Sequence, residues 1–104
     1  MQARVIDNPE QSRYEIFAGV DAGELAGYAE YFLGDDEIAF IHTEVDRRFE
    51  GHGLAGVLVR GALDAARERG LGVVPNCDYL RAWMRKHPEY LDLVPEQHRA
   101  PLGL

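Results

Sequence analysis

Residues 37–79 read EIAFIHTEVDRRFEGHGLAGVLVRGALDAARERGLGVVPNCDY, and most of the expected architecture can be inferred from them. Apolar and polar residues alternate over 37–45, as they do in a half-buried strand. Two glycines follow, Gly51 and Gly53, and from Leu54 onward apolar residues recur every three or four positions, which is typical of an amphipathic helix. The apolar run 72–75 then reads as a short buried strand. The stretch therefore predicts the order strand, glycine loop, helix, strand.

The residues before this stretch predict further strands. Apolar segments at 5–6, 14–18 and 25–33 are separated by turn signals at Asn8-Pro9, at Gly19 and at 34–36. In the longest segment, strict alternation places four residues on one face: Ala26, Tyr28, Glu30 and Phe32. Three or four consecutive strands joined by tight turns form an antiparallel meander.

The residues after the stretch complete the expected domain. Asn76 and Asp78 can each cap a second helix over 79–85, and a Pro-rich segment, 95–104, is expected to be a loose arm. The fold class is α+β: a mostly antiparallel sheet, made of a four-strand meander plus one strand after the motif helix, covered by two helices. A single domain is expected over residues 1–94.

Composition narrows the possible functions. The chain has 104 residues, of which 46% are hydrophobic and 28% charged, as in one ordinary globular domain. A formal net charge of -7 argues against a nucleic-acid partner, and no apolar run is long enough to cross a membrane. One cysteine and an N-terminus without a secretory pattern predict a cytoplasmic protein.

The negative charge is concentrated in the first half of the chain. Residues 1–47 hold eleven acidic and three basic residues, a net charge of -8, whereas residues 48–104 have a net charge of +1. An acidic half can attract a cationic amine, but acids that only keep the surface soluble explain the pattern equally well.

The glycine loop has the character of an anion site. A helix N-terminus presents unpaired backbone N–H groups and partial positive charge, and glycines let the backbone approach a phosphate closely. Residues 50–55 read Glu-Gly-His-Gly-Leu-Ala; no Gly-Lys-Ser/Thr follows, so the loop is not a Walker motif.

Strand, glycine loop, helix and short strand together resemble the acetyl-CoA motif of the GNAT N-acetyltransferase superfamily. That motif is Q/R-x-x-G-x-G/A; Gly53 and Ala55 match it, whereas Glu50 replaces its first residue. The segments 41–45, 74–79 and 87–94 resemble short single-module members of about this length. Larger members carry two helices between their first strands, and this chain lacks them.

The resemblance implies a binding mode for acetyl-CoA or coenzyme A. The pantetheine arm would lie between two splayed strands, the first ending at Val45 and the second at Pro75. Backbone groups of the first strand would pair with it, and the loop amides would hold the pyrophosphate. The implied cofactor-binding residues are Ile41, Thr43, Val45, Gly51, His52, Gly53, Leu54, Ala55 and Asn76.

Four residues are candidates for the chemistry. His42 alternates with Ile38 and Phe40, so it is expected on their face, either as a general base or as a structural histidine. Glu44, one step along that face, is the second base candidate. Tyr79 could protonate the leaving thiolate, a role that tyrosines fill in this superfamily, or simply pack in a helix.

Cys77 is the fourth candidate. It stands at the expected start of the second helix, where it could accept an acetyl group, line the thioester pocket, or pack as a small buried residue. The four histidines and the cysteine show no zinc-ligand spacing, so no metal site is expected.

Three functions follow from these observations. The leading hypothesis is an N-acetyltransferase that acetylates a small-molecule or protein amine. The alternative is an acyl-CoA-binding or sensing module with little turnover, and a third is a structural protein that has lost the ligand. The sequence does not indicate an oligomeric state.

Overall fold

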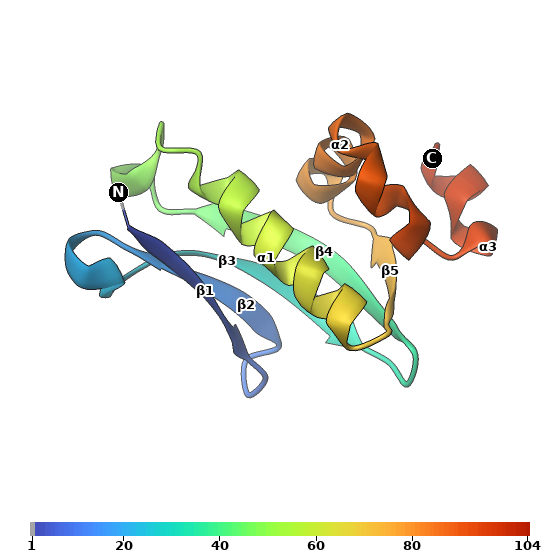
Figure 1. Cartoon of the computed structure of the whole chain (residues 1–104), viewed down its shortest axis with the longest axis horizontal. Coiled ribbons are helices and arrows are strands. Elements are labelled where there is room, and N and C mark those ends of the chain that lie inside the picture. The colour runs from blue at the N-terminus through green and yellow to red at the C-terminus, as the bar shows by residue number, and fades with distance from the viewer. Residues whose placement is uncertain (1) are drawn as a thin grey trace.

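The computed structural model describes residues 2–104, which form one five-stranded sheet with helices on one face (Figure 1). The strands lie in chain order from β1 to β5, and only the β4–β5 pair is parallel. The strands are β1 (Ala3–Asn8), β2 (Arg13–Ala18), β3 (Glu24–Leu33), β4 (Glu37–Val45) and β5 (Gly72–Pro75). The predicted α+β class, with its meander and added strand, is confirmed.

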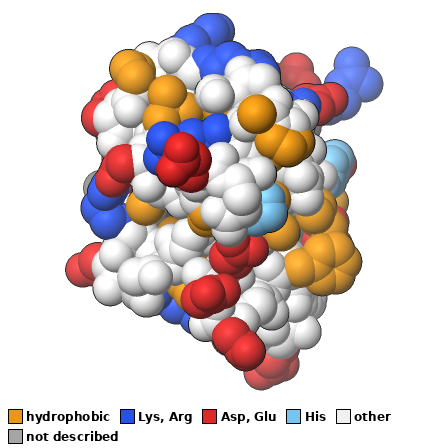
Figure 2. Space-filling model, turned by 90° about the vertical axis from the view of Figure 1, so that its right-hand side faces the viewer, with side chains coloured by type: hydrophobic (Ala, Val, Ile, Leu, Met, Phe, Trp, Pro, Cys, Tyr) orange, Lys and Arg blue, Asp and Glu red, His pale blue; other side chains and the backbone are white. Residues whose placement is uncertain are grey.

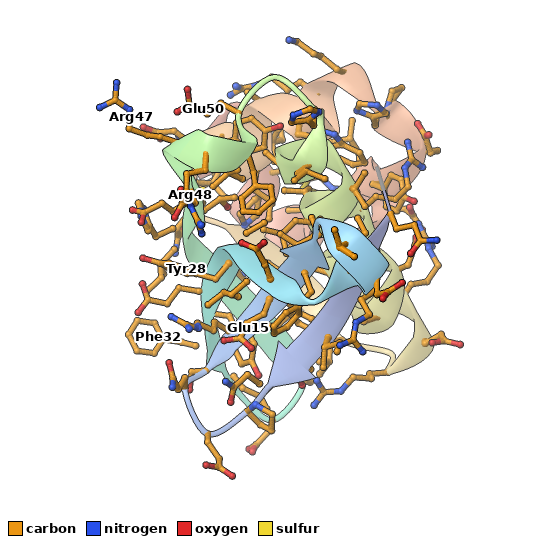
Figure 3. All side chains as sticks on the ribbon, turned by 90° about the vertical axis from the view of Figure 1, so that its left-hand side faces the viewer. Glu15, Tyr28, Phe32, Arg47, Arg48 and Glu50 are labelled. Carbon is orange, nitrogen blue, oxygen red and sulfur yellow. The ribbon has the colours of Figure 1, made fainter. Side chains whose placement is uncertain are left out.

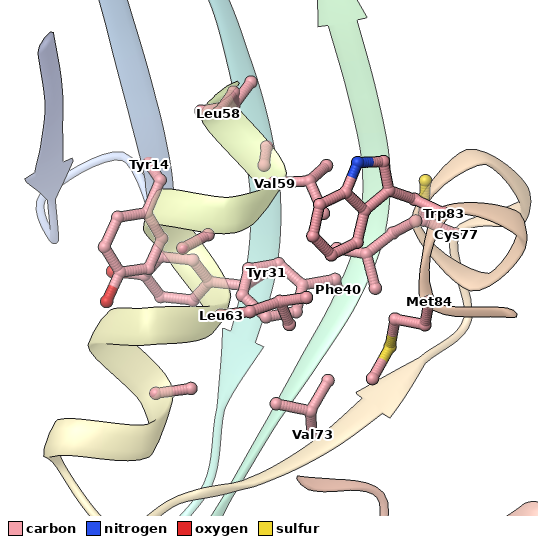
Figure 4. Close-up of a cluster of buried hydrophobic side chains, with 14 of the residues drawn as sticks. Tyr14, Tyr31, Phe40, Leu58, Val59, Leu63, Val73, Cys77, Trp83 and Met84 are labelled. Atoms are coloured by element: carbon pink, nitrogen blue, oxygen red, sulfur yellow. The ribbon is translucent and has the colours of Figure 1, made fainter. Parts of the chain in front are cut away.

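Helix α1 (Leu54–Glu68) lies over one face of the sheet and packs on the core side of its strands (Figure 1). Its buried stripe, which includes Leu58 and Leu63, packs on the core-facing side chains of β2 to β4. Helix α2 (Asp78–Lys86) extends the same core with Trp83 and Met84 (Figure 4). No helix within residues 2–104 has the length and apolar character that spanning a bilayer requires.

The other face of the sheet is open to solvent. Tyr28 and Phe32 project from it, on the side away from α1 (Figure 3), and Phe32 is 68% exposed. We call this the open face. Between β2 and β3 the chain forms only the 3-10 turn Val20–Ala22, so no helix from that connection covers it.

A β-bulge in β4 overturns the expected placement of His42. Tyr31 pairs with Phe40 and Glu30 pairs with His42, which leaves Ile41 as an extra residue. Residues directly opposite on paired strands share a face. Phe40 therefore lies in the core with Tyr31, whereas His42 lies on the open face with Glu30, so the predicted shared face is wrong.

A second bulge interrupts the expected alternation in β3. Ile16 pairs with Gly27 and Phe17 with Leu25, so Ala26 is the extra residue and is buried in the core. The prediction that Ala26 shares a face with Tyr28 is therefore wrong.

The start of α2 and the C-terminal segment also differ from expectation. Cys77 occupies the N-cap position without a side-chain capping bond, and Asp78 pairs instead with Arg81 at 2.6 Å. Residues 95–104 form the helix α3 (Glu96–Arg99) and a 3-10 turn, and His98 Nε2 lies 3.1 Å from Glu37 Oε2. This segment packs against the domain and is not a loose arm.

Candidate active site

The glycine loop forms an open cradle at the start of α1. Gly51 and Gly53 have φ angles of 83° and 70°, in the left-handed region that favours glycine. A Cβ atom at either position would meet no heavy atom within 4 Å, so the space around the loop is free. The predicted start of the helix at this loop is confirmed.

The first amides of α1 have no hydrogen-bond partner within the helix. The first hydrogen bond of α1 runs from the Val57 N–H to the Gly53 carbonyl at 3.3 Å, so the N–H groups of Leu54 and Ala55 precede it. These amides and the positive end of the 15-residue helix suit an anionic group. His52 is exposed within the same loop. The residues present therefore fit a pyrophosphate.

Two arginines beside the loop were missed in the sequence. Asp46 accepts a hydrogen bond from the Arg48 N–H at 2.9 Å and caps the 3-10 turn Arg47–Phe49. Burial of Phe49 anchors this turn, and Arg47 is exposed near Glu50 at the same end of the molecule (Figure 3). Arg47 can supply the positive charge that the motif's first residue would carry and that Glu50 does not. The two consecutive arginines in the sequence were the signal that could have indicated this.

The sheet opens between β4 and β5, and these strands end at Val45 and Pro75 as expected. Their pairing ends at Phe40 and Pro75, and β4 continues to Val45 with no partner on that edge. The Cys77 N–H still donates to the Phe40 carbonyl at 2.9 Å, after which the chain turns away into α2. The edge of β4 over 41–45 is thus free to pair with an extended ligand.

The two walls of this gap bring Thr43 and Cys77 together. Thr43 pairs with the buried Ala29 and so lies on the core side of β4, where its Oγ1 is 3.3 Å from Cys77 Sγ. Cys77 is only 6% exposed. Both side chains therefore line the gap from the face that carries α1, whereas Asn76 is exposed beside it.

Tyr79 follows Cys77 in the first turn of α2 and is half exposed. Burial of its ring, together with the nearby Cys77 side chain, raises the pKa of the Tyr79 hydroxyl above its ordinary value. The phenol therefore keeps its proton at neutral pH and can act as a donor.

His42 and Glu44 form a pair on the opposite side of the gap. His42 Nε2 lies 3.2 Å from Glu44 Oε1, and both side chains are more than half exposed on the open face. The Tyr28 ring lies beside them, with its centroid 6.0 Å from that of His42. A titratable pair thus adjoins the free edge of β4 from the side away from α1.

The candidates therefore fall into two groups, one on each side of the sheet. The glycine cradle, Thr43 and Cys77 lie on the α1 side, and His42 with Glu44 lies on the open face. The unpaired edge of β4 over 41–45 lies between the two groups. The sequence could not show this division, because it depends on the bulge at Ile41.

The chain resembles known proteins in sequence and in fold. A family model described as GCN5-related N-acetyl-transferase matches residues 13–93. The structure is similar to the solution structure of a GCN5-like candidate N-acetyltransferase from Staphylococcus aureus. The TM-score is 0.64 at 20% sequence identity, over 88% of this chain and 87% of that one.

No curated protein shows significant sequence similarity to the chain. The likeness to the solved structure supports the fold, and the family model covers most of the sequence, including both walls of the gap. The chain therefore belongs to the GCN5-related N-acetyltransferase family.

Proposed function

We propose that this protein is an N-acetyltransferase that moves the acetyl group of acetyl-CoA to an amine. The observation that carries the proposal is the continuity of three features: the open cradle at Gly51–Ala55, the unpaired edge of β4 over 41–45, and the His42–Glu44 pair. Together they would serve as a phosphate site, a path for an extended arm and a base at its far end.

The cradle residues would hold the pyrophosphate through their amides, assisted by Arg47. The pantetheine would pair with the backbone of Ile41, Thr43 and Val45, between that edge and Asn76. Acetyl-CoA supplies the activated acyl group, and backbone N–H groups at the bulge can polarise its carbonyl. Thr43 and Cys77 would pack beside the thioester.

The amine would approach from the open face. His42 would accept a proton from the amine nitrogen, held in place by Glu44. As the new C–N bond forms, the C–S bond of the thioester breaks and its electron pair leaves on sulfur. Tyr79, whose pKa is raised by burial, would donate the proton that the thiolate takes up.

Release of free thiol from acetyl-CoA, measured with a panel of primary amines, tests this proposal. The expected result is amine-dependent thiol release with an acetylated amine detected by mass spectrometry. His42→Gln should lower kcat by about 10²-fold or more, the usual contribution of a general base. Binding of acetyl-CoA without any amine-dependent release would instead favour the sensing module.

That alternative has one observation in its favour. The connection between β2 and β3 is only a 3-10 turn, so the protein itself does not enclose an acceptor on the open face. The same thiol-release measurement separates the two functions, because a sensor binds acetyl-CoA and leaves its thioester intact.

A further inference from the structure

The indole nitrogen of Trp83 has no hydrogen-bond partner among residues 2–104. The side-chain hydrogen bond at this residue is made by its backbone carbonyl, which accepts from His87 Nδ1 at 2.8 Å. Trp83 is 9% exposed, and none of the described polar side-chain atoms is fully buried without a partner. The indole N–H therefore reaches solvent through the small exposed part of a buried side chain.

This N–H lies at the first turn of α1, beside the free amides of the glycine cradle. A Cβ atom on Gly56 would be 3.4 Å from the indole nitrogen. Gly56 follows Leu54 and Ala55, whose N–H groups precede the first hydrogen bond of the helix. Gly56 itself has no side chain to cover the indole N–H.

The indole nitrogen is directed toward the gap where β4 and β5 separate. In Figure 4 it points toward the end of the core at which the Cys77 sulfur lies, and away from Val73 of β5. Cys77 is the N-cap of α2 and contacts Thr43 across the gap. The N–H therefore faces the region between the first turn of α1 and the start of α2.

Two neighbours fix the orientation of the Trp83 ring. The His87 ring stacks on it, with centroids 3.8 Å apart and planes inclined by 13°. The Arg60 guanidinium carbon lies 5.1 Å from the centroid of the indole, within the range of a cation–π contact. A donor that is already oriented loses little side-chain freedom when it binds a ligand, so its hydrogen bond contributes more to affinity.

The charge distribution favours a polyanion at this end of the molecule. On the side that carries α2 and the C-terminal segment, acidic side chains gather at the lower end, where the β3–β4 turn lies (Figure 2). Lys and Arg side chains gather at the upper end of the same view, toward which α2 also lies (Figures 1 and 2). Phosphate groups are thus repelled from the β3–β4 turn and attracted toward the end where α2 lies.

We propose that the Trp83 indole N–H donates a hydrogen bond to an oxygen of acetyl-CoA where its pyrophosphate joins the pantetheine arm. This inference rests on the proposed binding of acetyl-CoA and adds a side-chain donor to the amides of Leu54 and Ala55. Phosphate and amide carbonyl oxygens of the cofactor are both acceptors, and a buried tryptophan N–H is usually hydrogen-bonded. The bond holds the cofactor in place and takes no part in the transfer of the acetyl group.

The first test observes the proton directly. Because Trp83 is the only tryptophan of the chain, its indole gives a single N–H signal in a nitrogen-15 correlation spectrum. Saturating acetyl-CoA should move this proton downfield and slow its exchange with solvent. An indole proton that keeps its shift and its exchange rate in the saturated complex would overturn the inference.

The second test separates the N–H from the packing of the ring. Trp83→Phe keeps an aromatic ring without the N–H, so the Kd for acetyl-CoA, measured by titration calorimetry, should rise about three- to tenfold, the contribution of one hydrogen bond. Replacement of Trp83 by benzothienylalanine, which has the shape of tryptophan with sulfur in place of the N–H, should raise the Kd equally. The matched control is Tyr90→Phe, which removes a neighbouring hydroxyl that donates to Asp64 at 2.7 Å and should leave the Kd unchanged.

Each outcome bears on the inference. A parental Kd in the benzothienylalanine protein would overturn it, whether or not Trp83→Phe binds more weakly, because Trp83 would then act by packing alone. The proposed cofactor site would stand in that case. A parent protein that binds no acetyl-CoA would overturn both the inference and the proposed function.

Discussion

Thr43 Oγ1 and Cys77 Sγ lie 3.3 Å apart across the gap where β4 and β5 separate. This contact joins the unpaired half of β4 to the N-cap of α2, so the two walls of the gap touch on the side that carries α1. It also gives the only cysteine of the chain a polar neighbour in a buried position.

The first prediction concerns Cys77. Because its thiol is 6% exposed and contacts Thr43, we expect it to line the gap without carrying the acetyl group. Incubation with acetyl-CoA alone should leave the protein mass unchanged, and Cys77→Ala should retain turnover within about tenfold. An adduct of about 42 Da that disappears in the Cys77→Ser variant would show that the thiol is a nucleophile instead.

The second prediction separates the two faces of the sheet. His42→Gln should lower kcat and leave the KM for acetyl-CoA unchanged, since His42 lies on the open face and the cradle lies on the other side. Glu44→Gln should have a smaller effect, because it removes only the partner that orients the imidazole. Steady-state kinetics with acetyl-CoA varied at fixed amine measures both constants. An equal loss of acetyl-CoA binding in His42→Gln would argue that the residue acts structurally.

The sequence predicted the sheet, both main helices and the glycine loop, because each depends on local patterns. Alternation over 37–45 and the helical period from Leu54 are properties of adjacent residues. The bulges at Ala26 and Ile41 depend instead on how neighbouring strands pair. One bulge moved His42 to the open face, and no rule of alternation within a single strand could have indicated it.

Long-range contacts explain the remaining differences. Residues 95–104 pack on the domain through His98 with Glu37 and through Pro95 with Gly72, contacts between segments far apart in the sequence. Tyr28 was correctly placed on one face with Glu30 and Phe32, but alternation within one strand could not show that Glu44 of β4 lies opposite it.

The third prediction concerns Gly27, which pairs with Val45 at the end of β4. A Cβ atom there would collide with the Glu44 carbonyl oxygen, which belongs to backbone and cannot rotate away. Gly27→Ala should therefore push β4 outward, lower the free energy of unfolding by about 1–3 kcal/mol, and impair turnover. Denaturant unfolding measures the stability; an unchanged midpoint with full activity would show that the strands tolerate the methyl group.

The fourth prediction concerns stability at high pH. The Tyr31 hydroxyl donates to Asp7 Oδ1 at 2.6 Å in a partly buried position, and burial followed by this hydrogen bond raises the pKa of Tyr31 well above its ordinary value. A raised folded-state pKa stabilises the fold fully below the unfolded value near 10, and this stabilisation is lost as the pH rises above it.

Tyr31→Phe should therefore lower the free energy of unfolding by about 1 kcal/mol at pH 7, because the hydrogen bond is lost. It should also make the decrease in stability above pH 10 smaller. Urea unfolding at pH 7 and above pH 10 measures both effects. Tyr14, whose pKa is also raised by burial, should retain part of the alkaline response. An identical alkaline fall in the parent and the variant would rule out Tyr31 as its source.

Acetyl-CoA is expected to bind with its pyrophosphate on the glycine cradle. Thermal unfolding of three proteins with and without acetyl-CoA tests it: the parent, Ala55→Glu and the matched Ala55→Gln. A carboxylate in the first turn favours the helix but repels a phosphate, whereas glutamine has the same size and no charge. The single tryptophan, Trp83, provides a second readout, because its indole nitrogen lies close to the first turn of α1. A Cβ atom added to Gly56 in that turn would be 3.4 Å from this nitrogen.

At about a hundred times its Kd the ligand should stabilise the parent and Ala55→Gln by about 2.7 kcal/mol, or several degrees. Ala55→Glu should lose this shift and the accompanying change in tryptophan fluorescence. Equal shifts in Ala55→Glu and Ala55→Gln would show that the pyrophosphate does not bind at this loop. No shift in any of the three proteins at millimolar acetyl-CoA would contradict both the enzyme and the sensing module.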